Sequence, residues 1–509
     1  MEKIPTKKKS SGRALAYAGI ITAVGMLFGR LAGFVRELFV ASYFGTSTLA
    51  DSSIVLLTLP DLLIGLFMGG AINIVFIPFF QKIPNQERFR TFVTIQLFTV
   101  MSFISLCLVF YVGAHFLLDI LAPSLDSKAK LELLPLLRWT LIAVPITAGT
   151  AVTRAFLQSE QRFTTTAFAN FIYNLIVILC ISLFTGRWGI EAVVFGIILG
   201  TTLRWCSQLA NILFVVPRVW PFKSKIPARE LTAKYAQALG AGTILILYPY
   251  IARSFASLYF EDGSIAIFNY AYKLTELPFG VAISVFAIVI FPKLSSLSKD
   301  TVGLSQSAHL LVSRSIEVLF FLSIPLSLSL IWLFYHYQLN PIEVFNIPSL
   351  HIKAICELTI LGLLALPIRG LSSMHIAILS SKKDTLGPLY INLFCLSVLA
   401  VGCLFIKKVP TLSAIGLPLL VTYCCCCLLE ILYLWKKHEV RMKDYFSIKT
   451  VLLPGLVSVA VFSFLSTFCW KFNLDQPVEL FIMAVCGGTL CLVVQLFLNK
   501  EIVRSIKNK

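Results

Sequence analysis

Apolar residues occur along the chain in long runs separated by short polar segments. A helix that crosses a bilayer needs roughly 20 mostly apolar residues, because it rises only about 1.5 Å per residue. Applied to the 509 residues, this criterion predicts an all-α polytopic membrane protein with about fourteen transmembrane helices. The expected spans are 15–41, 49–80, 91–121, 132–158, 164–185, 189–216, 231–260, 265–293, 306–337, 351–380, 386–406, 411–435, 448–470 and 478–499.

Basic residues alternate between the polar segments. Both chain ends and the segments after the second, sixth, eighth, tenth and twelfth spans are rich in Lys and Arg, whereas the intervening segments hold few. Because basic loops stay on the cytoplasmic side, this pattern predicts that both termini are cytoplasmic. The first apolar run is longer than the core of a signal peptide and contains two arginines, so we expect a retained helix.

Composition agrees with this class of protein. Apolar residues make up 58% of the chain and charged residues only 13%, which excludes a disordered, coiled-coil or disulfide-rich secreted protein. The net charge of +18 is explained by the basic loops without a nucleic-acid partner. Four of the thirteen cysteines, 424–427, are consecutive and would point about 100° apart around a helix. They therefore cannot converge on one metal, and we expect small apolar core residues and no metal or cofactor.

The second and eighth predicted spans resemble each other. The second contains Pro60 and ends in Phe76-Ile77-Pro78, and the eighth contains Pro278 and ends in Ile290-Phe291-Pro292, 214 residues later. Such similarity can arise by chance between apolar helices, but an offset of six spans also predicts two lobes of the same topology facing a central cavity. The expected organisation is a basic N-terminus (1–14), an N-lobe (15–216), a basic linker (217–230), a C-lobe (231–435), a cytoplasmic loop (436–447), two appended helices (448–499) and a cytoplasmic tail (500–509).

Several charged residues lie inside predicted spans. A charge at the bilayer centre costs at least about 2.5–3.5 kcal/mol, so it is expected to face a partner, a cavity or water. Cations on the first helices of both halves predict an anion-accepting cavity, and guanidinium groups suit phosphate and carboxylate. Pairing between helices or snorkelling is the alternative, and fits Arg138, Arg154 and Arg369 best. The candidate binding residues are Arg30, Arg36, Asp51, Arg253, Lys273 and Glu276.

Enzyme signatures are missing from the sequence. It contains neither the phosphate-binding G-x-x-x-x-G-K-[ST] nor the zinc-binding H-E-x-x-H pattern. His375 lies deep in a span beside polar residues, where a buried core histidine is favoured over a catalytic one. Pairs of glycines four residues apart, such as Gly29 and Gly33, favour close helix packing. We therefore expect a carrier or channel rather than an enzyme.

One ordered set of motifs resembles a known family. Residues 29–37, Gly-Arg-Leu-Ala-Gly-Phe-Val-Arg-Glu, are similar to the first-helix signature R-x-x-G-F-x-R-[DE] of the MurJ/MviN lipid II flippases. The resemblance continues in register through Ala50-Asp51, Leu59-Pro60-Asp61, Phe76-Ile77-Pro78, Gln161-Arg162-Phe163, Asn174, Gly263-Ser264, Tyr270-Ala271-Tyr272-Lys273, Leu277-Pro278-Phe279-Gly280 and Lys383-Asp384-Thr385. It covers nearly the whole chain and is densest over residues 29–80 and 263–293.

The resemblance implies a flippase of the bacterial inner membrane, within the multidrug/oligosaccharidyl-lipid/polysaccharide exporter superfamily. Such a protein moves lipid II, the undecaprenyl-pyrophosphate-linked peptidoglycan precursor, to the outer leaflet for peptidoglycan biosynthesis and cell shape. Its partners would be lipid II, membrane lipids and cell-wall synthesis proteins. Alternating access would expose the head group while the tail stays in lipid. The alternatives are an exporter of another lipid-linked oligosaccharide and a non-transporting scaffold for cell-wall enzymes.

Family residues important for transport match Arg30, Arg36 and Asp51. The chain departs from the family elsewhere: Lys273 stands where an arginine is usual, and Ile64 and Gly65 stand where relatives have an arginine pair. Arg253 is a candidate to replace the missing cation. A sodium site described for some relatives is not expected, because the seventh span has no acidic residue between Leu231 and Phe260.

Overall fold

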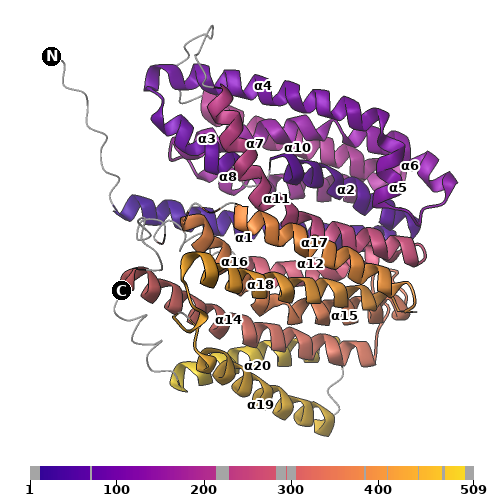
Figure 1. The fold of residues 1–509 in the computed structure, drawn as a ribbon. Helices are drawn as coiled ribbons and strands as arrows, with labels where there is room; N and C mark the ends of the chain where they lie inside the picture. Colours follow the sequence, from indigo (N-terminus) through magenta and orange to yellow (C-terminus); the bar gives the residue numbers. More distant parts are fainter. Residues whose placement is uncertain are drawn as a thin grey trace. The chain divides into compact units, whose positions relative to one another are not determined.

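The computed structural model describes residues 12–68, 71–213, 228–282, 294, 305–382, 384, 386–409, 411–444, 446–472 and 476–498 (Figure 1). Most of the basic N-terminus, residues 217–227 of the basic linker, the 290–293 motif and the tail from residue 499 lie outside these ranges. Within them the regular structure is helical, apart from one isolated bridge between Val344 and Ile347. The predicted all-α class is confirmed.

The helices follow the predicted spans closely. The first ten are α1 (Gly12–Phe44), α2 (Thr48–Phe67), α3 (Ala71–Lys82), α4 (Asn85–Val112), α5 (Ala114–Leu121), α6 (Ser127–Thr140), α7 (Ala143–Ser159), α8 (Thr164–Ala167), α9 (Ala169–Trp188) and α10 (Glu191–Leu213). The others are α11 (Ala228–Tyr259), α12 (Ser264–Ala282), α14 (Gln306–Leu339), α15 (Ser349–Leu364), α16 (Leu366–Ser381), α17 (Leu386–Ile406), α18 (Gly416–His438), α19 (Ile448–Phe472) and α20 (Pro477–Leu498), with short 3₁₀ turns at Leu412–Ile415 and Met442–Asp444.

Length and apolarity alone identify fewer spans than fourteen. Ten helices of the described residues are long and apolar enough to cross a membrane, and the pair α15 and α16, bent by 41°, makes an eleventh. The other three expected spans fall on α1, α11 and α12, and the last of these is described only as far as Ala282. The multi-pass architecture is therefore established, whereas the count of fourteen stays a prediction.

The chain divides into two compact units. The first contains Met1–Phe39, Leu59–Ala114 and Pro135–Ala236, and the second contains Val40–Thr58, His115–Leu134 and Gln237–Lys509. The boundaries fall inside α1, α2, α5, α6 and α11, and each unit combines segments that are separated in the chain. Residues 40–58 and 115–134, which the sequence assigned to the N-lobe, belong to the second unit.

Small residues bring the helices of the first unit together. A Cβ atom on Gly29 would lie 3.0 Å from the Cβ atom of Asn170, and one on Gly33 would lie 3.3 Å from Nδ2 of Asn174, so α9 packs directly on the glycine face of α1. Gly149 on α7 has the same function, because its Cβ position lies 2.6 Å from Nε2 of Gln96 on α4. These approaches hold α9 on α1 and α7 on α4.

The second unit is built around α14. The two C-terminal helices pack on it, with Trp332, Phe462, Leu465, Leu480 and Cys491 in one apolar cluster. α14 also packs against α15 and α16, and buried residues of α14, α16 and α18 share a second apolar cluster. The bend between α15 and α16 lies at Ala365, just before Pro367, and the Ser327 hydroxyl donates a 2.6 Å hydrogen bond to the carbonyl of Leu363. A backbone group at the break is thereby satisfied within the protein.

Several of the cysteines are buried in the protein core. All thirteen are free thiols, and Cys426 and Cys427 are buried in α18, whereas Cys424 and Cys425 are half-buried. Among the described residues, no group of three His, Cys, Asp or Glu side chains could hold a metal ion.

Candidate functional site

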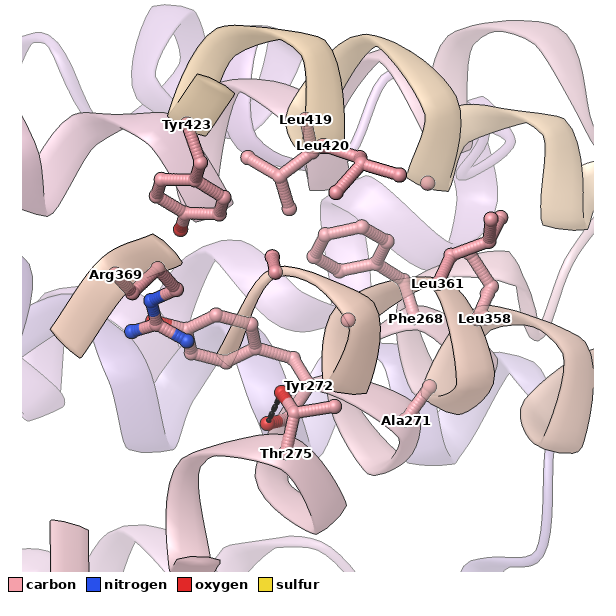
Figure 2. Close-up of a pocket in the computed structure, with 13 residues that line it drawn as sticks. Phe268, Ala271, Tyr272, Thr275, Leu358, Leu361, Arg369, Leu419, Leu420 and Tyr423 are labelled. Carbon is pink, nitrogen blue, oxygen red and sulfur yellow. Dashed lines mark hydrogen bonds between the residues drawn. The ribbon is translucent and has the colours of Figure 1, made fainter. Parts of the chain in front are cut away.

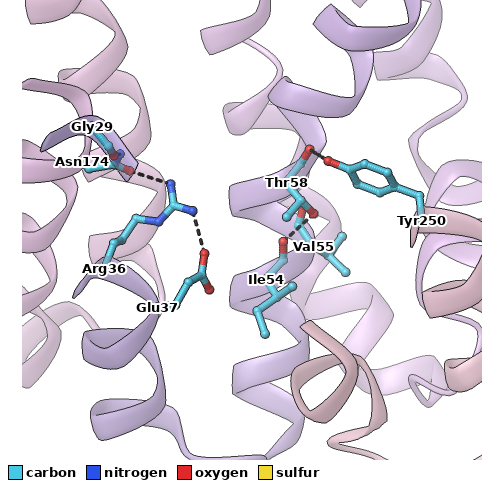
Figure 3. Close-up of polar contacts among 8 residues, drawn as sticks. All are labelled: Gly29, Arg36, Glu37, Ile54, Val55, Thr58, Asn174 and Tyr250. Atoms are coloured by element: carbon cyan, nitrogen blue, oxygen red, sulfur yellow. Dashed lines mark hydrogen bonds and ion pairs between the residues drawn. The ribbon is translucent and has the colours of Figure 1, made fainter. Parts of the chain in front are cut away.

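Arg36 is held rigidly inside the first unit. Only 5% of this residue is exposed. Its Nη2 atom forms a 2.7 Å ion pair with Oε1 of Glu37, and its Nη1 atom donates a 3.0 Å hydrogen bond to Oδ1 of Asn174 on α9 (Figure 3). Asn174 in turn donates from Nδ2 to the carbonyl of Gly29, over 3.1 Å. The R-x-x-G-F-x-R-E segment thus positions its second arginine through a side chain 138 residues away.

Two further arginines lie in the same unit and interact with the surroundings of Arg36. The Tyr173 ring stacks with both Arg36 and Arg204, whose guanidinium carbons lie 5.9 and 5.0 Å from the ring centre. Arg204 on α10 donates to the Thr147 hydroxyl over 3.1 Å, and Arg154 on α7 lies near enough to interact electrostatically with Arg204. We call Arg36, Arg154 and Arg204 the arginine cluster.

Among the described residues, the arginine cluster carries more positive charge than its carboxylate neighbours balance. Its carboxylate neighbours are Glu37 and Asp61, and Asp61 interacts electrostatically with Arg36 and Arg204. The Nε atoms of all three arginines are buried and have no hydrogen-bond acceptor among the described residues. Buried donors of this kind are suited to an anion that supplies oxygen acceptors. Arg30, half-buried on α1, lies six residues before Arg36.

Arg253 and Lys273 line one cavity of the second unit. This cavity has a volume of about 280 Å³, and Tyr250, Asn269 and Tyr272 line it as well. The Arg253 guanidinium carbon lies 4.9 Å from the centre of the Tyr250 ring. The Tyr250 hydroxyl donates to the carbonyl of Thr58 over 3.4 Å, at the right of Figure 3. Two of the cations predicted from the sequence are therefore brought together.

Glu276 on α12 forms its ion pair with a residue of another helix. Its carboxylate forms an ion pair with Arg369 on α16 rather than with Lys273, three residues earlier on α12. The Arg369 guanidinium carbon lies 4.1 Å from the ring centre of Phe279 and 5.0 Å from that of Tyr423. Figure 2 shows Arg369, Tyr272 and Tyr423 at one end of a pocket of about 30 Å³, with apolar side chains at the other end. For Arg369, this geometry agrees with pairing between helices.

Asp51 is fully buried and accepts hydrogen bonds from backbone groups. Its Oδ2 atom accepts from the N–H of Gly263 over 2.8 Å, and its Oδ1 atom accepts from the N–H of Ala266 over 2.7 Å. Both donors lie at the beginning of α12, where backbone N–H groups lack partners within the helix. Asp51 therefore caps α12 and joins the first turn of α2 to it. The structure gives this residue a positioning role.

A buried tyrosine joins α11 to α17. The Tyr248 hydroxyl on α11 lies 3.1 Å from the backbone carbonyl oxygen of Asn392 on α17 and 3.2 Å from Oδ1 of the same residue. Cys426 on α18 also donates to that Oδ1 atom, over 3.4 Å. These oxygen atoms are already hydrogen-bonded within the protein.

Sequence reasoning missed Arg204, although a usable signal was present. This residue lies in the middle of the apolar helix α10. The rule that singled out Arg30 and Arg36, that an intramembrane charge needs a partner or a cavity, applies equally to it. Tyr173 carried no such signal, since an aromatic residue on an apolar helix is ordinary.

A family model described as "Lipid II flippase MurJ" matches residues 40–487, most of the chain. The chain belongs to the lipid II flippase MurJ family. A MurJ-family relative from Borreliella burgdorferi, named a probable lipid II flippase, is 24% identical over 91% of this chain and 92% of its own length. A protein of the same name from Rickettsia prowazekii is 25% identical over 87% of this chain and 89% of its own length.

Solved structures show the same fold. A structure titled "Lipid II flippase MurJ, inward closed conformation" aligns with a TM-score of 0.79 at 17% identity, covering 95% of this chain and all of its own. A multidrug transporter of the MATE family in an inward-facing conformation aligns with a TM-score of 0.62 at 14% identity, covering 82% of this chain and 97% of its own. The MurJ-family chain described here is therefore a multi-pass membrane protein with the transporter fold shared by these structures.

Proposed function

We propose that this protein is a lipid II flippase of the bacterial inner membrane. It moves the undecaprenyl-pyrophosphate-linked peptidoglycan precursor from the inner to the outer leaflet, and its two termini lie in the cytoplasm. The family match over residues 40–487 and the names of the most similar relatives support this substrate. Transport of a bound lipid needs no covalent chemistry, so the protein acts as a carrier and not as an enzyme.

The arginine cluster is the observation that carries the proposal. Lipid II has a pyrophosphate and an acidic peptide, and a lipid-linked anion needs cationic donors within the membrane in order to cross it. Arg36, Arg154 and Arg204 supply three buried Nε–H groups without acceptors among the described residues. A guanidinium group binds phosphate through parallel hydrogen bonds, and the low dielectric constant around the cluster strengthens them.

The fixed orientation of Arg36 contributes to binding. Asn174 and Glu37 each accept one hydrogen bond from its terminal nitrogens, and its buried Nε–H has no acceptor among the described residues. A preorganised donor loses little conformational entropy when the head group arrives. The head group would exchange sides by alternating access, while the polyprenyl tail stays in hydrocarbon. Arg253 and Lys273 give the second unit a cationic cavity of its own. Arg253 is our candidate for the cation that the chain lacks at Ile64 and Gly65.

Complementation tests the proposal. A bacterial strain depleted of its own flippase would express the wild type, Arg36→Ala, Arg204→Ala or Arg253→Ala, and outer-leaflet lipid II would be measured at equal protein levels. Arg187→Ala is the matched control, because this arginine is exposed at the end of α9. We expect rescue by the wild type and Arg187→Ala, and at least a tenfold loss of outer-leaflet lipid II for Arg36→Ala and Arg204→Ala.

Two results would contradict the proposal or part of it. A properly inserted wild type that does not rescue would favour another lipid-linked oligosaccharide or a scaffold for cell-wall enzymes. Full activity of Arg253→Ala would exclude this residue as the replacement cation and would leave the role of the arginine cluster intact.

A further inference from the structure

His375 and Glu430 form a buried titratable pair inside the second unit. Their side chains are 0% and 1% exposed, and Nδ1 of His375 on α16 lies 3.3 Å from Oε2 of Glu430 on α18. The other carboxylate oxygen, Oε1, accepts a 2.9 Å hydrogen bond from the Ser372 hydroxyl and lies 3.6 Å from the Cys426 thiol. Neither the arginine cluster nor the cavity of Arg253 includes these two residues.

The pair balances its own charge. A lone carboxylate or imidazolium is costly at this depth, whereas an imidazolium next to a carboxylate is neutral overall. The helices packed around the pair present mainly neutral titratable groups. The neutral groups are Tyr248 on α11, Cys395 on α17, and Tyr423, Cys424, Cys427 and Tyr433 on α18. The charged groups are the half-buried Glu317 and the exposed Arg314 on α14, and Arg369 of α16, which pairs with Glu276 of α12.

Apolar packing isolates the pair on the side of α14. Leu371, Met374 and Ile378 of α16 belong to one buried cluster with Ile316 and Leu319 of α14. The gain or loss of one proton on the pair would therefore leave an uncompensated charge in a low-dielectric environment. A site of this kind responds to a proton by changing its contacts, as buried histidines do in pH-dependent switches.

Polar residues also lie towards both ends of α16. Arg369, Ser372 and His375 are spaced three apart, so neighbouring members are adjacent on the helix, and the first and last are turned by about 120° from each other. The Glu276–Arg369 pair lies towards the beginning of α16. Just beyond its end, Asp384 accepts hydrogen bonds from Tyr433 and His438 of α18. Side chains able to exchange protons thus lie on either side of His375 and Glu430.

α16 is a separate half of a bent span, so its contacts can change without unfolding α15. Broken helices form the coupling-ion sites of many secondary transporters, because the half-helix moves as one body. The contacts from His375 and Ser372 to Glu430 hold this half-helix on α18. Protonation of the pair alters these contacts between α16 and α18.

We propose that His375 and Glu430 bind one proton and couple its inward movement to the outward movement of one lipid-linked substrate. The proposal rests on the transport function proposed above. The proton adds to the imidazole, is held against the carboxylate, and leaves to water on the other side of the membrane, with no covalent bond formed and no redox step. One proton per cycle changes the equilibrium leaflet ratio of the substrate about tenfold for each pH unit across the membrane.

The first experiment measures protonation without transport. Infrared difference spectra of the purified full-length protein over a pH series report the carboxyl stretch. We expect a carboxylate or carboxyl change that is lost in Glu430→Gln and displaced in His375→Gln. His336→Gln is the matched control, because this half-buried histidine on α14 contacts only a backbone carbonyl among the hydrogen bonds described. A wild-type spectrum that Glu430→Gln leaves unaltered would overturn the proton site.

The second experiment measures coupling. Proteoliposomes containing fluorescent lipid II would be given an imposed pH gradient, and leaflet ratios would be read by quenching. We expect about a tenfold shift per pH unit for the wild type and His336→Gln. The double variant His375→Gln/Glu430→Gln keeps polar groups of similar size, and should equilibrate lipid II without responding to the gradient. An equal response of the double variant and the wild type would overturn coupling through this pair. Absence of wild-type transport would instead overturn the proposed function and with it the coupling. The infrared experiment tests proton binding by the pair, and its result does not depend on transport.

Discussion

Asp51 and Gly263 are joined by a 2.8 Å hydrogen bond from the backbone N–H of the glycine to Oδ2 of the carboxylate, although they lie 212 residues apart in the chain. The second oxygen of Asp51 accepts from Ala266, one turn further along α12. A carboxylate at a helix N-terminus satisfies unpaired donors and interacts favourably with the helix dipole. Residues that follow α1 and residues that begin α12 are thereby fastened within the second unit.

Replacement of Asp51 should loosen this connection. Asp51→Ala leaves two buried N–H groups without acceptors, and we expect it to lower the free energy of unfolding by about 1–3 kcal/mol. Asp51→Asn retains one oxygen acceptor and should cost less. The measurement is the apparent Tm of the detergent-purified protein, with Glu343→Gln, an exposed carboxylate, as the control. Equal values for Asp51→Ala and the wild type would contradict the capping role.

Gly263 is expected to tolerate no side chain. Its φ is +88°, and a Cβ atom there would lie 2.2 Å from the carbonyl oxygen of Thr46. Gly263→Ala should therefore destabilise the protein by about 1–3 kcal/mol, since both the backbone conformation and the contact oppose it. Gly186→Ala is the control, because its Cβ position on α9 meets nothing within 4 Å and alanine favours a helix. Thermal unfolding of the two variants should move in opposite directions.

Asp384 predicts an acid-dependent loss of stability. Burial acts to raise the pKa of Asp384, but hydrogen bonds from Lys437, His438, the N–H of Gly387 and Tyr433 outweigh it and lower the pKa to about 2. Because this folded-state pKa lies below the ordinary value of about 4, the stabilisation is fully present above pH 4 and is lost as the pH falls towards 2. The apparent Tm between pH 2.5 and pH 6 should decline less steeply in Asp384→Asn than in the wild type. Glu343→Gln should follow the wild-type curve.

Transport should not depend on sodium. The Tyr248 hydroxyl already occupies the oxygen atoms of Asn392 that a cation on α11 and α17 would use. Exchange of Na⁺ for K⁺ at constant ionic strength should leave the rate of lipid II movement within about twofold, since sodium prefers oxygen ligands that are not engaged elsewhere. A larger sodium dependence that disappears in Asn392→Ala would contradict this assignment of Tyr248.

Much of the fold was predictable because the signal for a membrane helix is strong. The ends of α9, α14 and α17 lie within a few residues of the predicted spans, since runs of about 20 apolar residues have few other uses. The break at Ala365 was not predicted. Pro367 occupies the beginning of α16, where proline fits a continuous helix start as well as a bend, so the sequence did not distinguish the two.

The sequence indicated candidate binding residues but not their contacts. Arg36 and Lys273 were singled out because charges in apolar helices are costly. Their partners were not found, because the contacts of Arg36 with Asn174 and of Glu276 with Arg369 join residues 138 and 93 positions apart. Glu276 lies three residues from Lys273 on α12, but its ion pair is with Arg369 of α16.

The bend at Ala365 makes α16 a lever. Its 16 residues extend about 24 Å from the pivot, so a rotation of about 10° moves the far end by about 4 Å. Arg369, one turn from the pivot, moves by only about 1 Å in the same rotation. The pairing of Arg369 with Glu276 therefore survives a movement that carries the end of α16, and Asp384 just beyond it, out of hydrogen-bonding range of Lys437 and His438. A rotation of α16 that leaves the Arg369–Glu276 ion pair intact thus separates the ends of α16 and α18.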